Sequence, residues 1–245
     1  MSSLLNKIKQ NTPKPPRIII YGESGLGKTT WAVNAQNPIV IQTEDGLGEL
    51  EVPCFALATS YYDVMSNLAD LSSEPHDFKT VVIDSLDWLE PLIWQQVCKD
   101  NGKDSIEAIG YGRGYNESLV YWSYFFDELN KCRDIGMTII MTAHSQITRI
   151  EDPEHAPFDM HDLKLHKKAA ALCREFADVI AYASLKKIIK TEEGKGFNPD
   201  RTRAISTGER IINLEPSPSF VAKNRYGLPA KLPLVWSEFA QHMKL

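Results

Sequence analysis

Apolar runs and helix-period segments alternate along the first 180 residues of this 245-residue chain. Four short, continuous apolar runs predict buried strands of a parallel sheet: residues 17–21, 38–42, 80–84 and 137–142. Other segments carry apolar residues at helical spacing and predict helices: residues 61–71, 86–99, 115–133 and 167–176. The alternation indicates an α/β fold with a mostly parallel sheet and helices on both faces.

The pattern changes in the second half of the chain. Residues 145–166 are polar and contain Pro153 and Pro157, which predicts a long loop. One more strand is expected over residues 178–182. From residue 183 onward we expect short antiparallel strands joined by turns at Glu193-Gly194, Thr207-Gly208 and Tyr226-Gly227. The predicted sheet therefore carries an antiparallel C-terminal extension on one edge.

Length and composition indicate one globular domain. Residues 1–16 are polar and end in TPKPP, which predicts a flexible N-terminal arm, and residues 17–245 suit a single domain with a large core. No apolar run approaches the length of a membrane span, and the first residues lack the apolar segment of a signal peptide. The four cysteines are scattered, which is typical of a reducing compartment. We expect a cytoplasmic protein without a membrane partner.

Charge is distributed unevenly along the chain, whose formal net charge is −5. Residues 29–185 contain 11 lysines and arginines against 25 aspartates and glutamates, whereas residues 186–225 contain nine against five. A basic segment on an acidic protein can attract a polyanion locally, although a solvated hairpin of mixed charge has the same composition.

Residues 22–29, GESGLGKT, fit the phosphate-binding pattern G-x-x-x-x-G-K-[ST]. A predicted strand precedes the loop and a helix can open directly after it, so backbone N–H groups and the helix dipole point at one place. We expect Lys28 to reach the β- and γ-phosphates of ATP and the Thr29 hydroxyl to ligate Mg²⁺. The expected nucleotide-binding residues are consecutive: Gly22, Glu23, Ser24, Gly25, Leu26, Gly27, Lys28, Thr29 and Thr30.

Two acidic residues at strand ends are candidates for the chemistry of hydrolysis. Asp84 ends the apolar run 80–84, where a carboxylate can hold Mg²⁺, although it could equally cap the next helix. Glu44 follows the strand over residues 38–42 and is the candidate that orients and deprotonates the attacking water. Asp45 and Asp87 are the alternatives for this second role.

His144 follows the predicted strand over residues 137–142. At the carboxyl edge of the sheet, a polar side chain can contact the γ-phosphate and report its presence to the segment that follows. We expect this γ-phosphate sensing from His144, with an ordinary polar residue at a strand end as the alternative.

Two polar segments combine basic and aromatic residues and are candidates for contact with single-stranded DNA. In residues 103–115, glycine, aromatic and arginine residues alternate, so that a base could stack while a phosphate is paired. Residues 145–168 carry several histidines and lysines. The candidate DNA contacts in the two segments are Arg113, Tyr115, Arg149, Lys164, Lys167 and Lys168, with an ordinary solvated loop as the alternative for each segment.

The order of these motifs resembles the RecA-like ATPase core. The segment AKNRYGLP over residues 222–229 is similar to the Lys-x-Arg hairpin of DnaB-type helicases. The whole chain is similar to phage-encoded AAA-type ATPases of the RecA-like group, some of which are single-strand annealing recombination proteins. GYGRGY over residues 110–115, TAH over 142–144 and KNRYGLP over 223–229 carry this resemblance.

The resemblance implies that Lys223 and Arg225 act in trans on the ATP of a neighbouring subunit, as arginine fingers do. It therefore implies a homo-oligomer, either a ring or a filament, with ATP at the subunit interfaces. The chain departs from full recombinases in being shorter and in having His144 where they commonly have glutamine.

We therefore expect a RecA-like, Mg²⁺-dependent ATPase that binds single-stranded DNA and promotes annealing or pairing in phage recombination. A single-strand-binding protein is a further expected partner, and the host cytoplasm is the expected location. Two other hypotheses about the function remain open. One is an ATP-regulated loader or scaffold for a replication protein, and the other is a helicase motor.

Overall fold

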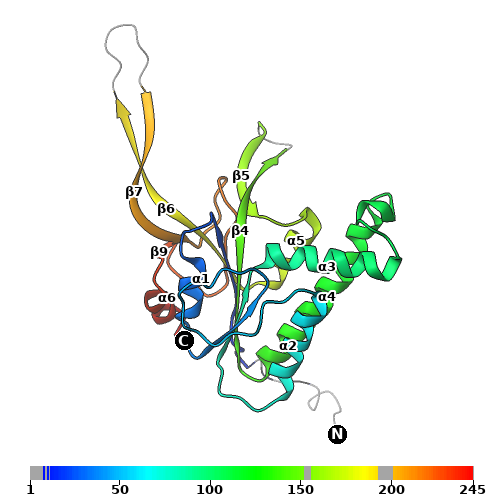
Figure 1. Cartoon of the computed structure of the whole chain (residues 1–245). Coiled ribbons are helices and arrows are strands. Elements are labelled where there is room, and N and C mark those ends of the chain that lie inside the picture. The colour runs from blue at the N-terminus through cyan, green and yellow to red at the C-terminus, as the bar shows by residue number, and fades with distance from the viewer. Residues whose placement is uncertain (1–7, 9, 11, 152–155, 193–200, 245) are drawn as a thin grey trace.

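Figure 1 shows a computed structural model of the chain, which describes residues 8, 10, 12–151, 156–192 and 201–244. Its central sheet has five mutually parallel strands in the order β2-β3-β4-β1-β6. These strands are β1 (Arg17–Gly22), β2 (Pro38–Gln42), β3 (Thr80–Asp84), β4 (Thr138–Ile150) and β6 (Val179–Glu192). The predicted parallel core is confirmed.

An antiparallel extension follows on the edge formed by β6, as the sequence predicts. β7 (Arg201–Asn213) and β8 (Lys223–Asn224) both pair with β6, and β9 (Lys231–Pro233) pairs with β7. In Figure 1, β6 and β7 form a long two-stranded arm that rises from the body of the molecule.

Helices cover both faces of the sheet (Figure 1). Alternate side chains of β1 point to opposite faces: Ile18 and Ile20 pack towards one, Ile19 and Tyr21 towards the other. The first face is covered by α1 (Lys28–Val33) and α6 (Trp236–Met243), as their buried residues show. The second is covered by α2 (Tyr61–Ser73), α3 (Leu86–Asn101), α4 (Arg113–Asp134) and α5 (Lys167–Phe176). The predicted helices are found, extended by at most two residues at an end.

The prediction of a long loop over residues 145–166 is wrong. β4 continues to Ile150 and pairs in antiparallel register with β5 (Phe158–Leu163), so that most of the segment is a hairpin. Pro157 precedes β5, while Pro153 lies outside the described residues. Gln146 to Ile150 alternate in exposure, and a strand that is buried on neither face gives no continuous apolar run to detect. Both this hairpin and the β6–β7 arm extend from the carboxyl ends of core strands (Figure 1).

Of the strands expected to be short after residue 183, β8 and β9 are short, but β6 and β7 are long. β6 has 14 residues and β7 has 13. Thr207-Gly208 is not a turn: it lies inside β7, where the register with β6 shifts between Leu185 and Lys187. Gly208 takes a φ of +80° there, which suits a β-bulge. Gly227 also has a left-handed φ, in keeping with the third expected turn, and Glu193-Gly194 lies outside the described residues.

The expected N-terminal arm lies partly outside the described residues. Where it joins the domain, Arg133 Nε of α4 donates to the Pro15 carbonyl at 2.5 Å, and Ile139 N of β4 donates to that of Pro16 at 3.0 Å. Within the described part of the chain, no helix is long and apolar enough to cross a membrane. All four cysteines are free, and Cys54 alone among them is exposed.

Candidate nucleotide site and nucleic-acid surface

The phosphate loop joins the end of β1 to the start of α1, as its motif requires. Gly22 is sterically obligatory, because a Cβ there would lie 2.4 Å from the Ala183 carbonyl oxygen of β6. Gly25 and Gly27 have φ angles of +75° and +94°, which disfavour any residue with a side chain. The glycines therefore serve the tight path of the loop between β1 and α1.

Lys28 is buried at the first position of α1. Its Nζ donates to the carbonyl oxygens of Glu23 at 2.9 Å and Gly22 at 3.2 Å, so the ammonium group lies across the phosphate loop. Burial lowers the pKa of Lys28, while the nearby carboxylates of Asp87 and Asp84 act in the opposite direction. The cation is therefore placed where phosphates bound in the loop would lie.

Asp84 receives two hydroxyl hydrogen bonds at the end of β3. Thr29 Oγ1 donates to Asp84 Oδ2 at 2.9 Å, and Thr142 Oγ1 of β4 donates to the other carboxylate oxygen. A hydroxyl and a carboxylate are hard oxygen ligands of the kind that Mg²⁺ prefers. Thr29 and Asp84 thus fit the predicted Mg²⁺ site, with the Asp84 side chain almost fully buried.

Glu44 lies beside this pair, just beyond the end of β2. Thr43 fixes the chain here, because its Oγ1 donates to the Ser85 carbonyl at 2.6 Å and accepts from Ser85 N at 2.8 Å. Burial raises the pKa of Glu44, and the negative charge of Asp84 raises it further. A half-buried carboxylate with a raised pKa suits proton transfer. The alternative Asp45 is exposed.

His144 and Asp87 form a pair at the carboxyl end of β4. His144 Nδ1 lies 2.9 Å from Asp87 Oδ2, and His144 N donates to Asp87 Oδ1 at 2.9 Å. Burial would raise the pKa of Asp87, but the hydrogen bonds from His144 hold it below its ordinary range. Ser85 Oγ also donates to Asp87, so its carboxylate is engaged in orienting His144. The sensing role of His144 stays a prediction.

The β4–β5 hairpin begins directly at His144. Lys164 N donates to the His144 carbonyl at 2.9 Å, and the Gln146 side-chain amide donates to the carbonyls of Leu163 and Leu165. These contacts join the strand that carries His144 to the segment preceding α5.

The structure brings the two candidate DNA-binding segments together. The Tyr115 ring stacks on that of His166 at 4.5 Å with an interplanar angle of 6°, and Lys168 donates to Asn116. Of the other candidates, Lys164 and Lys167 are exposed in the second segment, and Arg113 pairs with Glu117 on the α4 surface. Arg149 lies farther along the β4–β5 hairpin, facing Asp159 at 3.6 Å.

A family described as an AAA domain matches residues 14–226 of the chain. The chain belongs to this family. Domains of this class bind nucleotide at a P-loop core and typically use Mg²⁺, which agrees with the site formed by Lys28, Thr29 and Asp84.

A curated relative comes from a prophage. The chain is 23% identical over 175 residues to the SPbeta prophage-derived uncharacterized protein YorG of Bacillus subtilis (strain 168). The match covers 68% of this chain and 50% of that protein, so the chain spans about half the length of the relative. The similarity supports a phage context for this AAA domain.

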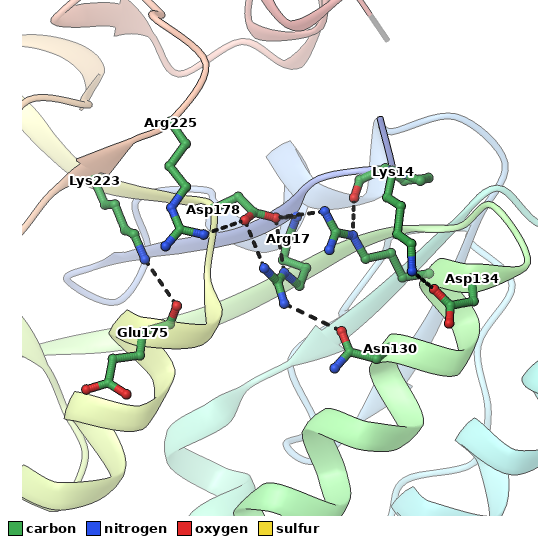
Figure 2. Close-up of polar contacts among 10 residues, drawn as sticks. Lys14, Arg17, Asn130, Asp134, Glu175, Asp178, Lys223 and Arg225 are labelled. Carbon is green, nitrogen blue, oxygen red and sulfur yellow. Dashed lines mark hydrogen bonds and ion pairs between the residues drawn. The ribbon is translucent and has the colours of Figure 1, made fainter. Parts of the chain in front are cut away.

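Lys223 and Arg225 lie at the amino end of the sheet, because β8 pairs with the start of β6, whereas the phosphate loop follows the carboxyl end of β1. Figure 2 shows both residues beside Asp178 and Glu175. Asp178 accepts hydrogen bonds from Arg17 at the start of β1, from Arg133 and from Arg225, the last at 3.1 Å. Lys223 Nζ donates to the Arg174 and Glu175 carbonyls at the end of α5. Because β1 has six residues, about 17 Å of strand separates this cluster from the loop of the same subunit.

Three residues that lie at or beside the candidate nucleotide site are assigned no role from the sequence. Thr142 and Thr43 orient Asp84 and Ser85, yet each is only a threonine at a strand end. Arg210 of β7 is the third: its guanidinium would lie 3.1 Å from a Cβ on Gly27. It lines a cavity of about 380 Å³ beside the phosphate loop together with Thr30 and Trp236. Only the basic composition of residues 186–225 hints at Arg210.

Proposed function

We propose that this AAA domain is a RecA-like, Mg²⁺-dependent ATPase that binds single-stranded DNA and promotes annealing or pairing in phage recombination. One observation carries the proposal: the two candidate DNA-binding segments meet where Tyr115 stacks on His166. The second segment is also bonded to the strand of His144, because Lys164 N donates to the His144 carbonyl. An aromatic and basic surface next to a γ-phosphate sensor is what nucleotide-dependent binding of a single strand requires.

The residues at the carboxyl edge of the sheet would have separate roles in hydrolysis. Lys28 and the loop N–H groups would bind the phosphates, and Thr29 with Asp84 would hold Mg²⁺, which neutralises developing charge when bound. Glu44 would orient the attacking water and accept its proton, since a raised pKa makes its carboxylate a stronger proton acceptor. The cavity lined by Thr30, Arg210 and Trp236 offers space for the base and ribose.

Lys223 and Arg225 would act on the ATP of a neighbouring subunit in a ring or filament. Two features support this assignment. Both residues are about 17 Å of strand away from the loop of their own subunit. Arg225 is also the most exposed of the three arginines on Asp178, at 54% against 16% for Arg17 and 15% for Arg133.

An ATP-regulated loader or scaffold for a replication protein is the second candidate. The acidic excess in residues 29–185 favours it, because such a surface repels DNA and suits a basic protein partner. A helicase motor would have the same core and is a further candidate. The similarity of residues 222–229 to the Lys-x-Arg hairpin of DnaB-type helicases favours this function.

A paired substitution in the merged surface tests DNA binding. Arg113→Ala with Lys167→Ala should weaken binding to a labelled single strand and lower the salt slope by about 1.4, at roughly 0.7 per phosphate contact. Lys79→Ala with Lys131→Ala is the matched control, because both lysines are exposed near the amino edge of the sheet. Equal salt slopes for the two double variants would contradict the assignment of this surface.

A further inference from the structure

A cavity of about 490 Å³ lies among the start of α3, the start of α4 and the segment before α5. We propose that it receives a nucleobase of a bound single strand, whose phosphates lie on the basic residues at its mouth. The inference rests on the proposed function and deepens it by naming the part of the strand that the cavity takes. The lining residues used below are Asp87, Trp88, Glu90, Trp94, Tyr115, Lys164 and His166.

Aromatic rings form much of the cavity wall. Trp94 meets Tyr115 edge to face at 5.3 Å, and Tyr115 stacks on His166 at 4.5 Å. Trp88 is the third residue of α3 and is 52% exposed, so its indole is not buried in the core. An exposed indole beside a cavity offers a face on which a base can stack, whatever the sequence of the strand.

Two ring nitrogens in the wall are buried and have no hydrogen-bond partner among the described residues. They are Trp94 Nε1, a donor, and His166 Nδ1, which donates or accepts according to tautomer. Glu90 adds a buried carboxyl group that accepts from His166 N at 2.9 and 3.1 Å. A nucleobase edge carries both donors and acceptors, so it can satisfy groups that a purely apolar occupant would leave unpaired.

Lys164 lines the cavity, and two more lysines directly follow its wall residue His166 in the chain. The Lys164 side chain is 60% exposed and lies 4.0 Å from Asp87. Lys167 and Lys168 occupy the first turn of α5, where the helix dipole disfavours positive charge and no acidic residue is present. Cations placed against the dipole are favoured once an anion lies near them. A base in the cavity with its phosphate at the mouth meets the aromatic wall and the lysines at once, whereas a neutral apolar side chain meets only the wall.

The cavity also adjoins the nucleotide site. Asp87 lines it and holds His144 through two hydrogen bonds. Occupancy of the cavity and of the γ-phosphate position therefore acts on the same residue pair. This arrangement gives a direct route by which nucleotide and strand can influence each other's binding.

The test compares a labelled oligothymidylate with an abasic sugar-phosphate oligomer of equal length, using the full chain. Wild-type protein should bind the base-containing strand about tenfold more tightly, the ratio expected for one stacked base. Trp88→Ala should abolish this preference while leaving binding of the abasic strand unchanged. Tyr62→Ala is the matched control, because Tyr62 is an exposed aromatic residue on α2.

Trp94→Phe is a second test, because it keeps an aromatic ring, now a phenyl group, and removes the unpaired N–H. It should lower the preference without changing the affinity for the abasic strand. Equal binding of both strands by wild-type protein would overturn this inference and leave DNA binding itself intact. An unchanged preference in both Trp88→Ala and Trp94→Phe would also overturn it. Failure of wild-type protein to bind either strand would overturn the proposed function and this inference together.

Discussion

Thr29 and Asp84, 55 residues apart in the chain, meet through a hydrogen bond of 2.9 Å from the Thr29 hydroxyl to the Asp84 carboxylate. β4 lies between the strands that lead to them, and its Thr142 donates to the second oxygen of Asp84. The strand order therefore assembles the proposed Mg²⁺ ligands and their support from three separate elements.

Thr142→Val should destabilise the protein and weaken its use of Mg²⁺. The substitution keeps the shape of the side chain but leaves a buried, charged oxygen of Asp84 without its donor, which costs about 1–3 kcal/mol. We expect a lower free energy of unfolding in urea and a higher Mg²⁺ concentration for half-maximal ATPase activity. Thr142→Ser retains the hydroxyl and should behave like wild type. Identical behaviour of the two variants would contradict the role of Thr142.

Glu44→Gln should lower kcat by about 10²–10⁴-fold, the usual contribution of a general base. ATP binding should be retained, because Lys28 and the phosphate loop are untouched. Asp45→Asn is the matched control and should leave kcat within a few-fold of wild type. Loss of activity in Asp45→Asn with little loss in Glu44→Gln would move the catalytic role to Asp45. Both outcomes are read from steady-state ATP hydrolysis and from binding of a labelled nucleotide.

The pH dependence of hydrolysis should follow the ionisation of Glu44. Its pKa is raised by burial and by Asp84, and the base is active only when deprotonated. Activity should therefore be full at high pH and fall as pH drops through the raised pKa, above the range of an ordinary carboxyl group. A kcat that stays constant down to the ordinary carboxyl range would show that another group accepts the proton.

Arg225→Ala should reduce ATP turnover by about 10³–10⁵-fold, as loss of an arginine finger does, while nucleotide still binds. Mixing it with Lys28→Ala tests whether the action is in trans. An interface between the two variants can combine an intact phosphate loop with an intact Arg225, so the mixture should recover activity that neither has alone. Normal turnover by Arg225→Ala alone, or no recovery on mixing, would contradict the assignment.

Glu90→Gln should remove a pH dependence of stability. Burial raises the pKa of Glu90 to about 7, so the folded protein holds a proton there that the unfolded chain releases near pH 4–5. Stability from this group is present at low pH and is lost as pH rises towards 7, by up to ~3 kcal/mol. The difference in unfolding free energy between variant and wild type should grow in favour of the variant from pH 5 to pH 8. A constant difference would contradict a raised pKa.

Much of the nucleotide site could be predicted from the sequence because its signals are local. The loop over residues 22–29 is a contiguous motif between a strand and a helix, and Asp84 closes an apolar run. The core strands are buried on both faces, so they stand out as continuous apolar segments.

The remaining features depend on pairing between distant segments, which local patterns do not encode. The support of Asp84 by Thr142 follows from the register of β3 beside β4. The β4–β5 hairpin has polar residues on both strands, so it lacks an apolar signal. The aromatic cavity unites Trp94, Tyr115 and His166 from three elements, and no spacing in the sequence relates them.

The most direct test of the central proposal is binding of a labelled single-stranded oligonucleotide to the full chain. It should be measured without nucleotide, with ADP and with a non-hydrolysable ATP analogue, each at low and moderate salt. The proposal predicts the tightest binding with the ATP analogue and a marked loss of affinity as salt rises. Absence of binding in all three nucleotide states would contradict a DNA-binding ATPase and favour the loader or scaffold that acts on a protein partner.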